Sequence, residues 1–384
     1  MPFYQRRGRI PAKRHTVLER DGGGMYYEEL IGNEGFRGAS TLLYRLHRPT
    51  RMLEATLLKR LRWEPHGDRS LRPYHLRLGR VPAVGDLCLD RLPVLYNQDI
   101  AVTVSRPRTT GEGFYRNGQG DEIVYVARGD GVLESALGDL TFGEGDYLVI
   151  PRGLVHRYRL EGDDHLFLVL ESRGVVRVPA RYRNDYGQFV EGAPFCERDI
   201  RVPENLRPRD ETGEFLIYTK MHNALTEHRV QTHPFDVVGW DGAYYPWAFQ
   251  IRNFEPVVGM IHLPPPVHQT FQGEGFVVCS FVPRPFDFHP KGVPAPYNHS
   301  NAQTDEVLFY ASDEFMSRKG IEFGSLTLHP DGIPHGPHPG KAEASVGVER
   351  TDELAVMVDT FRPLHLAKPG LEYNDVDYLR SWLE

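Results

Sequence analysis

One spacing pattern occurs twice in this chain and limits its possible folds more than any other feature. Gly145 to His156 and Gly324 to His335 both read G-x5-P-x-G-x2-H. The proline restricts φ and the glycine accepts a positive φ, so a short strand would enter a tight turn and the next strand would begin with a histidine of fixed direction. Four matched positions in two distant segments favour internal duplication over chance.

The rest of the sequence favours strands. Gly 38 and Pro 30 are frequent, and Tyr 19 and Phe 20 suit pleated, half-buried surfaces. From about 111 to 172 and again from 235 onward, short apolar runs alternate with glycine turns at the spacing of a sandwich or small barrel. The sequence therefore predicts an all-β fold with two β-barrel halves.

We divide the chain accordingly. Residues 1–100 are predicted to be an N-terminal arm and a β-rich segment packed on the first barrel, and 101–175 to be that barrel. Residues 176–234 are predicted to be an irregular linker or arm, and 235–384 the second barrel. Apolar residues at helical spacing near the end predict a short C-terminal helix: Val376, Leu379 and Leu383.

Charge and cysteine content exclude several classes of protein. The net charge of −7 argues against a nucleic-acid partner, and we interpret the basic cluster at 6–14 as solvated surface or a subunit contact. The chain has neither a signal-peptide pattern nor an apolar run of about 18 residues, so we predict a cytoplasmic protein without a membrane segment. Its three cysteines form no CxxC pair, so a thiolate zinc site is not indicated.

The second copy of the repeat carries a candidate metal site. His299 and Glu306 precede it, and His335 closes it. Two imidazoles and one carboxylate are the ligands of a mononuclear non-heme Fe(II) site with open positions; zinc or manganese fits them less specifically. Asp305 is the alternative carboxylate. Burying three polar groups without a metal would cost about 1–3 kcal/mol each, which favours metal binding.

The first copy lacks this set. Tyr115-x-Asn117-x4-Glu122 stands where His299-x-Asn301-x4-Glu306 stands in the second. Both frames resemble the H-x-H-x4-E pattern of the cupin superfamily, which implies a bicupin of two jelly-roll barrels. We predict that the first barrel binds no metal and that His156 has a structural role.

A more specific resemblance spans nearly the whole chain. The segments YYEELIGNEGF, HPFDVVGWDG, PYNHSN, HPDGIPHGPHPG and ELAVMVDT, in this order, resemble the homogentisate 1,2-dioxygenase family. The resemblance implies one Fe(II) in the second barrel, held by His299, Glu306 and His335, and subunits assembled as trimers or hexamers. It also implies a substrate site lined by Tyr297, Asn301, His329 and His335.

One position departs from the family. The resemblance implies an acid/base histidine inside the W-x-G segment, where this chain has Asp241. Asp241 could serve as a base if burial raised its pKa, or it could cap a loop without a chemical role. We assign His329 and Asp241 as the candidate catalytic residues, with His329 donating to a substrate oxygen. We expect His338 to lie on the surface.

The predicted function is Fe(II)-dependent ring cleavage that inserts both atoms of O2 into homogentisate to give maleylacetoacetate. Because of Asp241, the same chemistry on gentisate, hydroquinone or a related 2-hydroxy aromatic acid stays open. The alternative from another class is a non-catalytic bicupin that binds or stores a small ligand. The ligand set is retained in one half and lost in the other, which argues against this non-catalytic alternative.

Overall fold

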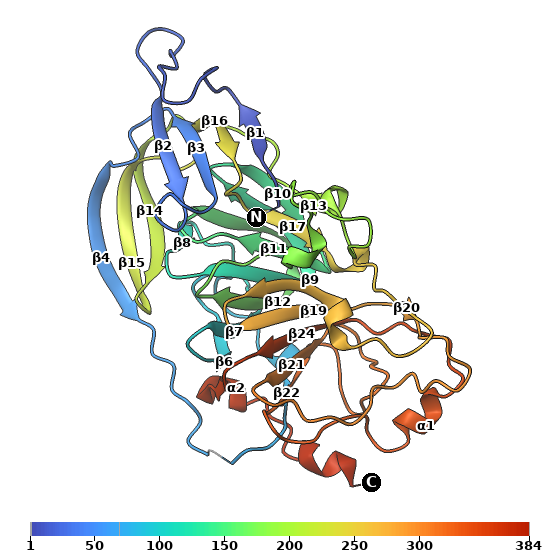
Figure 1. The fold of residues 1–384 in the computed structure, drawn as a ribbon. Helices are drawn as coiled ribbons and strands as arrows, with labels where there is room; N and C mark the ends of the chain where they lie inside the picture. The colour runs from blue at the N-terminus through green and yellow to red at the C-terminus, as the bar shows by residue number, and fades with distance from the viewer. Residues whose placement is uncertain (1, 69, 384) are drawn as a thin grey trace.

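The computed structural model describes residues 2–68 and 70–383. Strands dominate this part of the chain, and they form two β-barrel halves joined along one long axis (Figure 1). The predicted all-β bicupin is thereby confirmed. No helix of the described residues has the length and apolar character needed to cross a membrane.

The first half is built on a 13-stranded sheet that curls around the middle of the molecule. Its strands are β4 (Met52–Arg60), β6 (Leu92–Tyr96), β7 (Ile100–Ser105), β8 (Phe114–Asn117), β9 (Asp121–Ser135), β10 (Gly138–Phe142), β11 (Asp146–Ile150), β12 (His156–Ser172), β13 (Ile200–Arg201), β14 (Thr212–Met221), β15 (Ala224–Thr232), β17 (Trp247–Gln250) and β25 (His365–Leu366).

Three further sheets complete the architecture. A four-stranded sheet caps one end, in the order β1 (Gln5–Gly8), β16 (Val237–Gly242), β3 (Ser40–Arg45) and β2 (Tyr27–Gly32). A six-stranded sheet forms the second half, in the order β18 (Gln269–Gly273), β19 (Phe276–Phe281), β24 (Ala355–Thr360), β21 (Asp305–Tyr310), β22 (Ser325–His329) and β5 (Tyr74–Arg77). A small pair, β20 (Arg284–Pro285) and β23 (Arg350–Thr351), lies beside it.

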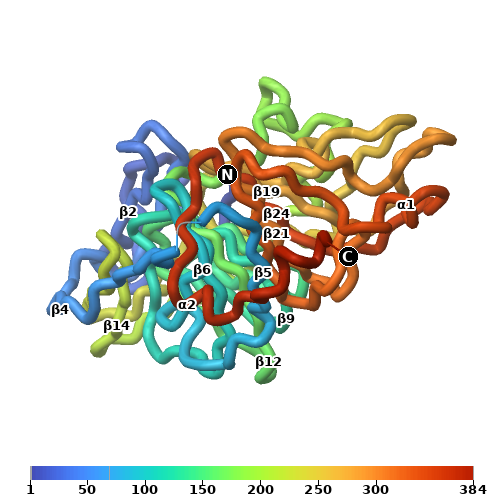
Figure 2. The backbone as a smooth tube through the Cα atoms, turned by 90° about the horizontal axis from the view of Figure 1, so that it is seen from below, coloured from blue at the N-terminus to red at the C-terminus, as the bar shows by residue number. Residues whose placement is uncertain are grey.

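Helical segments are short. The described α-helices are α1 (Lys341–Ser345) and α2 (Lys368–Leu371), and 3₁₀ turns occur at η1 (Leu78–Arg80), η2 (Ala180–Tyr182), η3 (Glu197–Asp199), η4 (Ile251–Asn253), η5 (Pro265–His268) and η6 (Tyr378–Trp382). Seen from below, α2 lies over β6 and the C-terminal turn η6 runs beside β5 (Figure 2). The C-terminal segment thus covers the second half, where the predicted ligands are.

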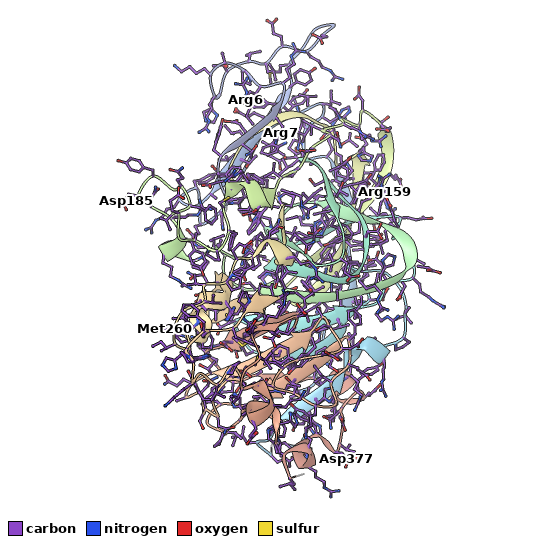
Figure 3. The ribbon with its side chains drawn as sticks, turned by 90° about the vertical axis from the view of Figure 1, so that its right-hand side faces the viewer. Arg6, Arg7, Arg159, Asp185, Met260 and Asp377 are labelled. Carbon is purple, nitrogen blue, oxygen red and sulfur yellow. The ribbon has the colours of Figure 1, made fainter. Side chains whose placement is uncertain are left out.

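The predicted irregular connection at 176–234 is wrong for its second part. β14 and β15 form a long hairpin that joins β8 on one side and β4 on the other. Its strands were missed because β15, ALTEHRVQT, is half-exposed and polar and carries little alternating hydrophobicity. The N-terminal segment predicted as an arm likewise contributes strands β1 to β4. Its basic residues Arg6 and Arg7 lie at the opposite end of the molecule from Asp377 (Figure 3).

Strand pairing reproduces the sequence repeat. In the first half His156 pairs with Tyr115, and in the second His335 pairs with His299. Glu122 lies opposite Ile150, just as Glu306 lies opposite His329. The two copies of the motif therefore place their side chains at equivalent register positions.

One apolar core spans both halves. The ring of Phe271 in β18 lies 5.2 Å from that of Tyr147 and 5.5 Å from that of Trp247, both from the first half. The Tyr147 hydroxyl also shares a 2.9 Å hydrogen bond with Ser280 of β19. Each buried aromatic contributes about 1.5–3 kcal/mol by removal from water, so the two halves stabilise each other.

His233 gives this core a measurable pH dependence. Its ring packs against Phe114 and Phe235, and burial lowers its pKa to about 4. A lowered histidine pKa means that the unfolded state takes up a proton first. The stability that neutral His233 contributes is complete above pH 6.5 and is lost as the pH falls toward 4.

We expect His233→Asn to flatten the dependence of the urea midpoint on pH between 6.5 and 4, because asparagine does not titrate there. Asparagine can still accept the hydrogen bond that the Phe235 amide donates to Nδ1 of His233 over 3.0 Å. Parallel curves for the two proteins over this range would contradict the assignment.

Candidate metal centre

The three predicted ligands converge in the second half. Glu306 is the second residue of β21, and His299 and His335 lie on two segments that exchange backbone hydrogen bonds of 2.9 Å in both directions. Gly332, at φ +74°, makes the preceding turn that the repeat predicted. One ligand atom from each of the three residues lies within 4.8 Å of the other two.

Both histidines point the same nitrogen at Glu306. Nδ1 of His299 donates to the Tyr297 carbonyl over 3.1 Å, and Nδ1 of His335 donates to the Ile333 carbonyl over 2.9 Å. In the neutral ring each Nε2 therefore carries a lone pair, and these atoms lie 3.7 and 3.6 Å from Oε2 of Glu306. In both cases the hydrogen bond to the carbonyl two residues earlier fixes the orientation of the ring.

The donor atoms fit a cation. Nε2 of His335 is buried and has no hydrogen-bond partner among the described residues. An orphaned buried nitrogen is costly, and a metal ion shared with His299 and Glu306 would satisfy it. Two imidazole nitrogens and a carboxylate oxygen converging from three segments form a ligand set with open positions opposite the protein.

Glu306 is held as an anion. Burial opposes its ionisation, but the hydrogen bond that Nδ1–H of His329 donates over 2.8 Å and the neighbouring imidazoles of His299 and His335 outweigh burial and hold the pKa of Glu306 well below its usual range. Arg318, whose Nη2 lies 3.9 Å from Oε1, adds positive charge. The site therefore presents a negative ligand without needing a metal to deprotonate it.

His329 does not have the position that we predicted. Both of its ring nitrogens are occupied, by Glu306 Oε1 at 2.8 Å and by the Tyr378 hydroxyl at 3.1 Å. The side chain is fully buried, and burial lowers its pKa to about 4, so Nδ1–H donates and Nε2 accepts. The geometry therefore contradicts His329 as a donor to substrate and makes it a residue that orients Glu306.

The C-terminal segment contributes Tyr378 to the hydrogen-bond network of His329 and Glu306. The predicted helix is a 3₁₀ turn, η6, which buries Tyr378, whereas the three apolar residues that predicted it are exposed. His338 is also buried rather than on the surface: its Nε2 lies 2.7 Å from the Ser381 hydroxyl, and it stacks on Trp382 at 4.1 Å. Helical spacing alone could not identify which face packs.

Asp305 has a structural task. Its two oxygens accept the backbone N–H groups of Asp331 and Leu364 over 2.8 and 2.7 Å. Asp121, its counterpart in the first half, accepts from Arg152 and Val176 in the same way. Both carboxylates tie a strand start to the turn that precedes the histidine, which leaves Glu306 as the carboxylate that faces the histidines.

The remaining predicted residues lie at different depths. Tyr297 is exposed, and its ring is 5.9 Å from that of His299, so it stands at the mouth of the site. Asn301 is half-buried, and its carbonyl accepts from Gly332 in the turn before His335. Both lie near the metal ligands in space as well as in sequence.

Asp241 is not brought to the cluster. It lies on β16 at the far end of the molecule from β21 and β22 (Figure 1). Its carboxylate accepts from the Tyr4 hydroxyl at 2.7 Å and from Arg14 at 3.2 Å, which ties the N-terminal arm to β16. Within one chain this position contradicts Asp241 as the acid/base and gives it a structural role.

The equivalent place in the first half is filled by a side-chain cation. Arg91 donates to both oxygens of Glu122, over 2.7 and 3.0 Å, and the pair is buried. Although burial opposes ionisation, Arg91 holds the pKa of Glu122 at about 2. His156 keeps the i−2 bond of Nδ1, to Leu154 at 3.0 Å. A guanidinium thus neutralises the buried glutamate of the first half, whereas the corresponding glutamate of the second half faces His299 and His335.

A cavity of about 100 Å³ opens onto His299 and Glu306. Its walls are largely apolar and include Phe281, Phe315 and Met357. Sequence reasoning missed its polar members, His268, Arg284 and Arg318, since none lies at a motif spacing. His268 is buried with Nδ1 unpaired among the described residues, and burial lowers its pKa to about 3, so it is neutral.

Comparison with known proteins agrees with this architecture. The family model described as "Homogentisate 1,2-dioxygenase N-terminal" matches residues 50–251. A protein of Saccharolobus solfataricus named "Putative dioxygenase" is 40% identical over all of this chain and 99% of its own length. Human homogentisate 1,2-dioxygenase is 23% identical over 74% of this chain and 67% of its own length, and the Emericella nidulans enzyme 26% over 59% and 52%.

The fold and the site define a bicupin with a two-histidine, one-glutamate centre in its second half. A cupin barrel protein of Leptotrichia buccalis is similar over 77% of this chain at 10% identity, with a TM-score of 0.36, so the fold assignment rests on the sheets themselves. By the family model and the full-length relative, the chain belongs to the homogentisate 1,2-dioxygenase family.

Two matched substitutions distinguish the carboxylates. Glu306→Gln should abolish stoichiometric metal binding, because it removes the anionic oxygen between the two Nε2 atoms. Asp305→Asn should keep metal stoichiometry but lower thermal stability, because its NH₂ group would face a backbone N–H. Elemental analysis and calorimetry measure both; the reverse pattern would make Asp305 the ligand.

Tyr378 should tune the metal site without touching it. Tyr378→Phe removes the donor to Nε2 of His329, and loss of such an outer partner typically weakens metal affinity about tenfold or more. Competition with a chromophoric chelator measures the change. Tyr373→Phe is the control, since Tyr373 packs beside α2 without a side-chain hydrogen bond among the described residues. Equal metal affinities of Tyr378→Phe and Tyr373→Phe would show that the bond between Tyr378 and His329 does not influence metal binding.

Proposed function

We propose that this protein is a non-heme Fe(II) dioxygenase that opens the ring of homogentisate to give maleylacetoacetate. The observation that supports it best is the convergence of two unprotonated imidazole nitrogens on one buried carboxylate, in a chain of the homogentisate 1,2-dioxygenase family. His299, Glu306 and His335 would hold the metal. Fe(II) bound there would couple the reduction of O2 to oxidation of an electron-rich ring.

The protein's own residues would bind and orient the substrate. The apolar walls exclude water and fit an aromatic ring. Arg284 is paired with Glu353 at 2.9 Å, whereas Arg318 lies 3.9 Å from Glu306 and its Nε is buried without a hydrogen-bond partner among the described residues. Arg318 is thus the wall cation best suited to an acidic substituent, and neutral His268 is suited to a ring hydroxyl.

Proton transfer needs a group that also reaches solvent. His262 lines the cavity, its side chain is 41% exposed, and its Nδ1 lies 3.7 Å from Asp287 Oδ2. Its ring also meets Tyr297 at 5.2 Å. We assign proton exchange at the mouth to His262, with Tyr297 positioned beside it, in place of His329 and Asp241.

A homo-oligomer, a trimer or hexamer, belongs to the same proposal. β4 is the last strand on its side of the 13-stranded sheet and exposes four large apolar side chains: Met52, Leu53, Leu57 and Leu58. An edge strand of this composition is costly in water and is commonly covered by another subunit. A cytoplasmic location also stays a prediction.

Oxygen consumption tests the proposal and its alternatives. The ferrous protein, kept reduced with ascorbate, should consume O2 with homogentisate, and His335→Ala should remove both the iron and the uptake. His289→Ala, an exposed histidine outside the cavity, is the control. Uptake with only gentisate, hydroquinone or a 2-hydroxy aromatic acid would identify that compound, and not homogentisate, as the substrate. No uptake with any of them would favour a binding or storage protein.

A further inference from the structure

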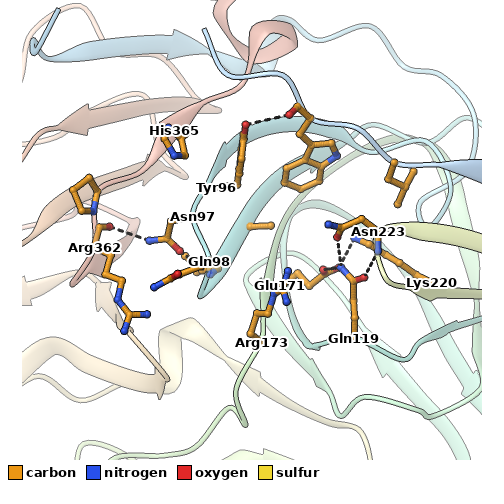
Figure 4. A pocket seen from close by; sticks show the side chains of 15 residues that line it. Tyr96, Asn97, Gln98, Gln119, Glu171, Arg173, Lys220, Asn223, Arg362 and His365 are labelled. Carbon is orange, nitrogen blue, oxygen red and sulfur yellow. Dashed lines mark hydrogen bonds and ion pairs between the residues drawn. The ribbon is translucent and has the colours of Figure 1, made fainter. Parts of the chain in front are cut away.

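A second cavity, of about 480 Å³, lies at the rim of the first half (Figure 4). Turns between β6 and β7, β8 and β9, and β14 and β15 line it, together with the segment that follows β24. None of its lining residues lines the cavity at the metal centre. It is therefore a separate compartment that the ring-cleavage proposal does not use.

The cavity carries one uncompensated positive charge. Lys220 is paired with Glu171 at 2.6 Å, and Arg362 with Asp99 at 2.5 Å. Arg173 also lines the cavity, and within the described chain its guanidinium has no carboxylate within ion-pair distance. A chain with a net charge of −7 thus exposes a free guanidinium inside a concave site, which favours a monoanionic ligand.

One wall is aromatic. The ring of Tyr96 lies 5.4 Å from that of Trp63, edge to face, and 5.4 Å from that of His365. Amide groups of Asn97, Gln119 and Asn223 line the cavity around these rings, and Figure 4 shows Lys220 and Gln119 across the cavity from Arg362 and Asn97. Flat apolar surface beside amides and one cation matches an aromatic ring with an acidic substituent.

We propose that this cavity binds the carboxylate form of a small aromatic acid, with Arg173 pairing the carboxylate and Trp63 and Tyr96 contacting the ring. The cavity adjoins the strand that carries the metal ligand. Leu364, between the lining residues Pro363 and His365, donates its backbone N–H to Asp305, the neighbour of Glu306. An aromatic acid would thus be held against the same chain segment that anchors β21.

The test uses phenylacetate as the probe and calorimetric titration of the full-length protein carrying His335→Ala. Removing a metal ligand abolishes metal-dependent binding but leaves the Arg318 wall of the other cavity intact, so the Arg173 and Trp63 variants are what assign the remaining binding to this cavity. We expect one saturable site per chain, weakened about tenfold or more by Arg173→Gln and by Trp63→Leu, and unchanged by Arg108→Gln, an exposed arginine outside the cavity. Neutral phenylacetamide and ring-free acetate should both bind at least tenfold more weakly.

Absence of saturable phenylacetate binding in the His335→Ala protein, or equal affinity in Arg173→Gln, would overturn the site. Acetate binding as tightly as phenylacetate would overturn the aromatic class of the ligand. Because the titration needs neither iron nor turnover, its failure is distinct from a failure of the dioxygenase proposal.

Discussion

The placement of Glu306 is the constraint on which the metal centre depends. A carboxylate buried in a barrel is unstable as an anion unless other groups compensate it. Here three histidines and Arg318 do so, and His329 is in turn oriented by Tyr378 from the C-terminal segment. The last turn of the chain is therefore part of the centre, although it supplies no ligand.

The two halves show two solutions to the same electrostatic problem. Each buries a glutamate at the second position of a strand, opposite the end of a neighbouring strand. The first half neutralises Glu122 permanently with the guanidinium of Arg91. In the second half Arg318 approaches Oε1 of Glu306, whereas Oε2 faces His299 and His335, so an added metal ion can be accommodated there.

Each half contains strands that come from the part of the sequence assigned to the other half, so the two halves are held together by shared sheets. β5, from the N-terminal segment, completes the sheet that holds His329, and β17 extends the sheet of the first half. The 365–366 strand pairs back onto β6, close to the aromatic wall of the second cavity. Both cavities are therefore supported by segments distant in sequence, and changes in one half bear on packing in the other.

The sequence by itself determined the fold class, the duplication and the two histidines of the convergent site, and it favoured Glu306 over Asp305 as the third member. These follow from local rules: glycine and proline set the turns, and a period of two sets which residues point inward. The choice between Asp305 and Glu306 needed the structure, because only backbone partners distant in sequence show that Asp305 is a cap. The same is true of His329, Asp241 and His338, whose roles depend on contacts with Tyr378, Tyr4 and Trp382 made across the fold. Sequence spacing predicts the direction of a side chain, whereas the tertiary structure decides which residues that side chain contacts.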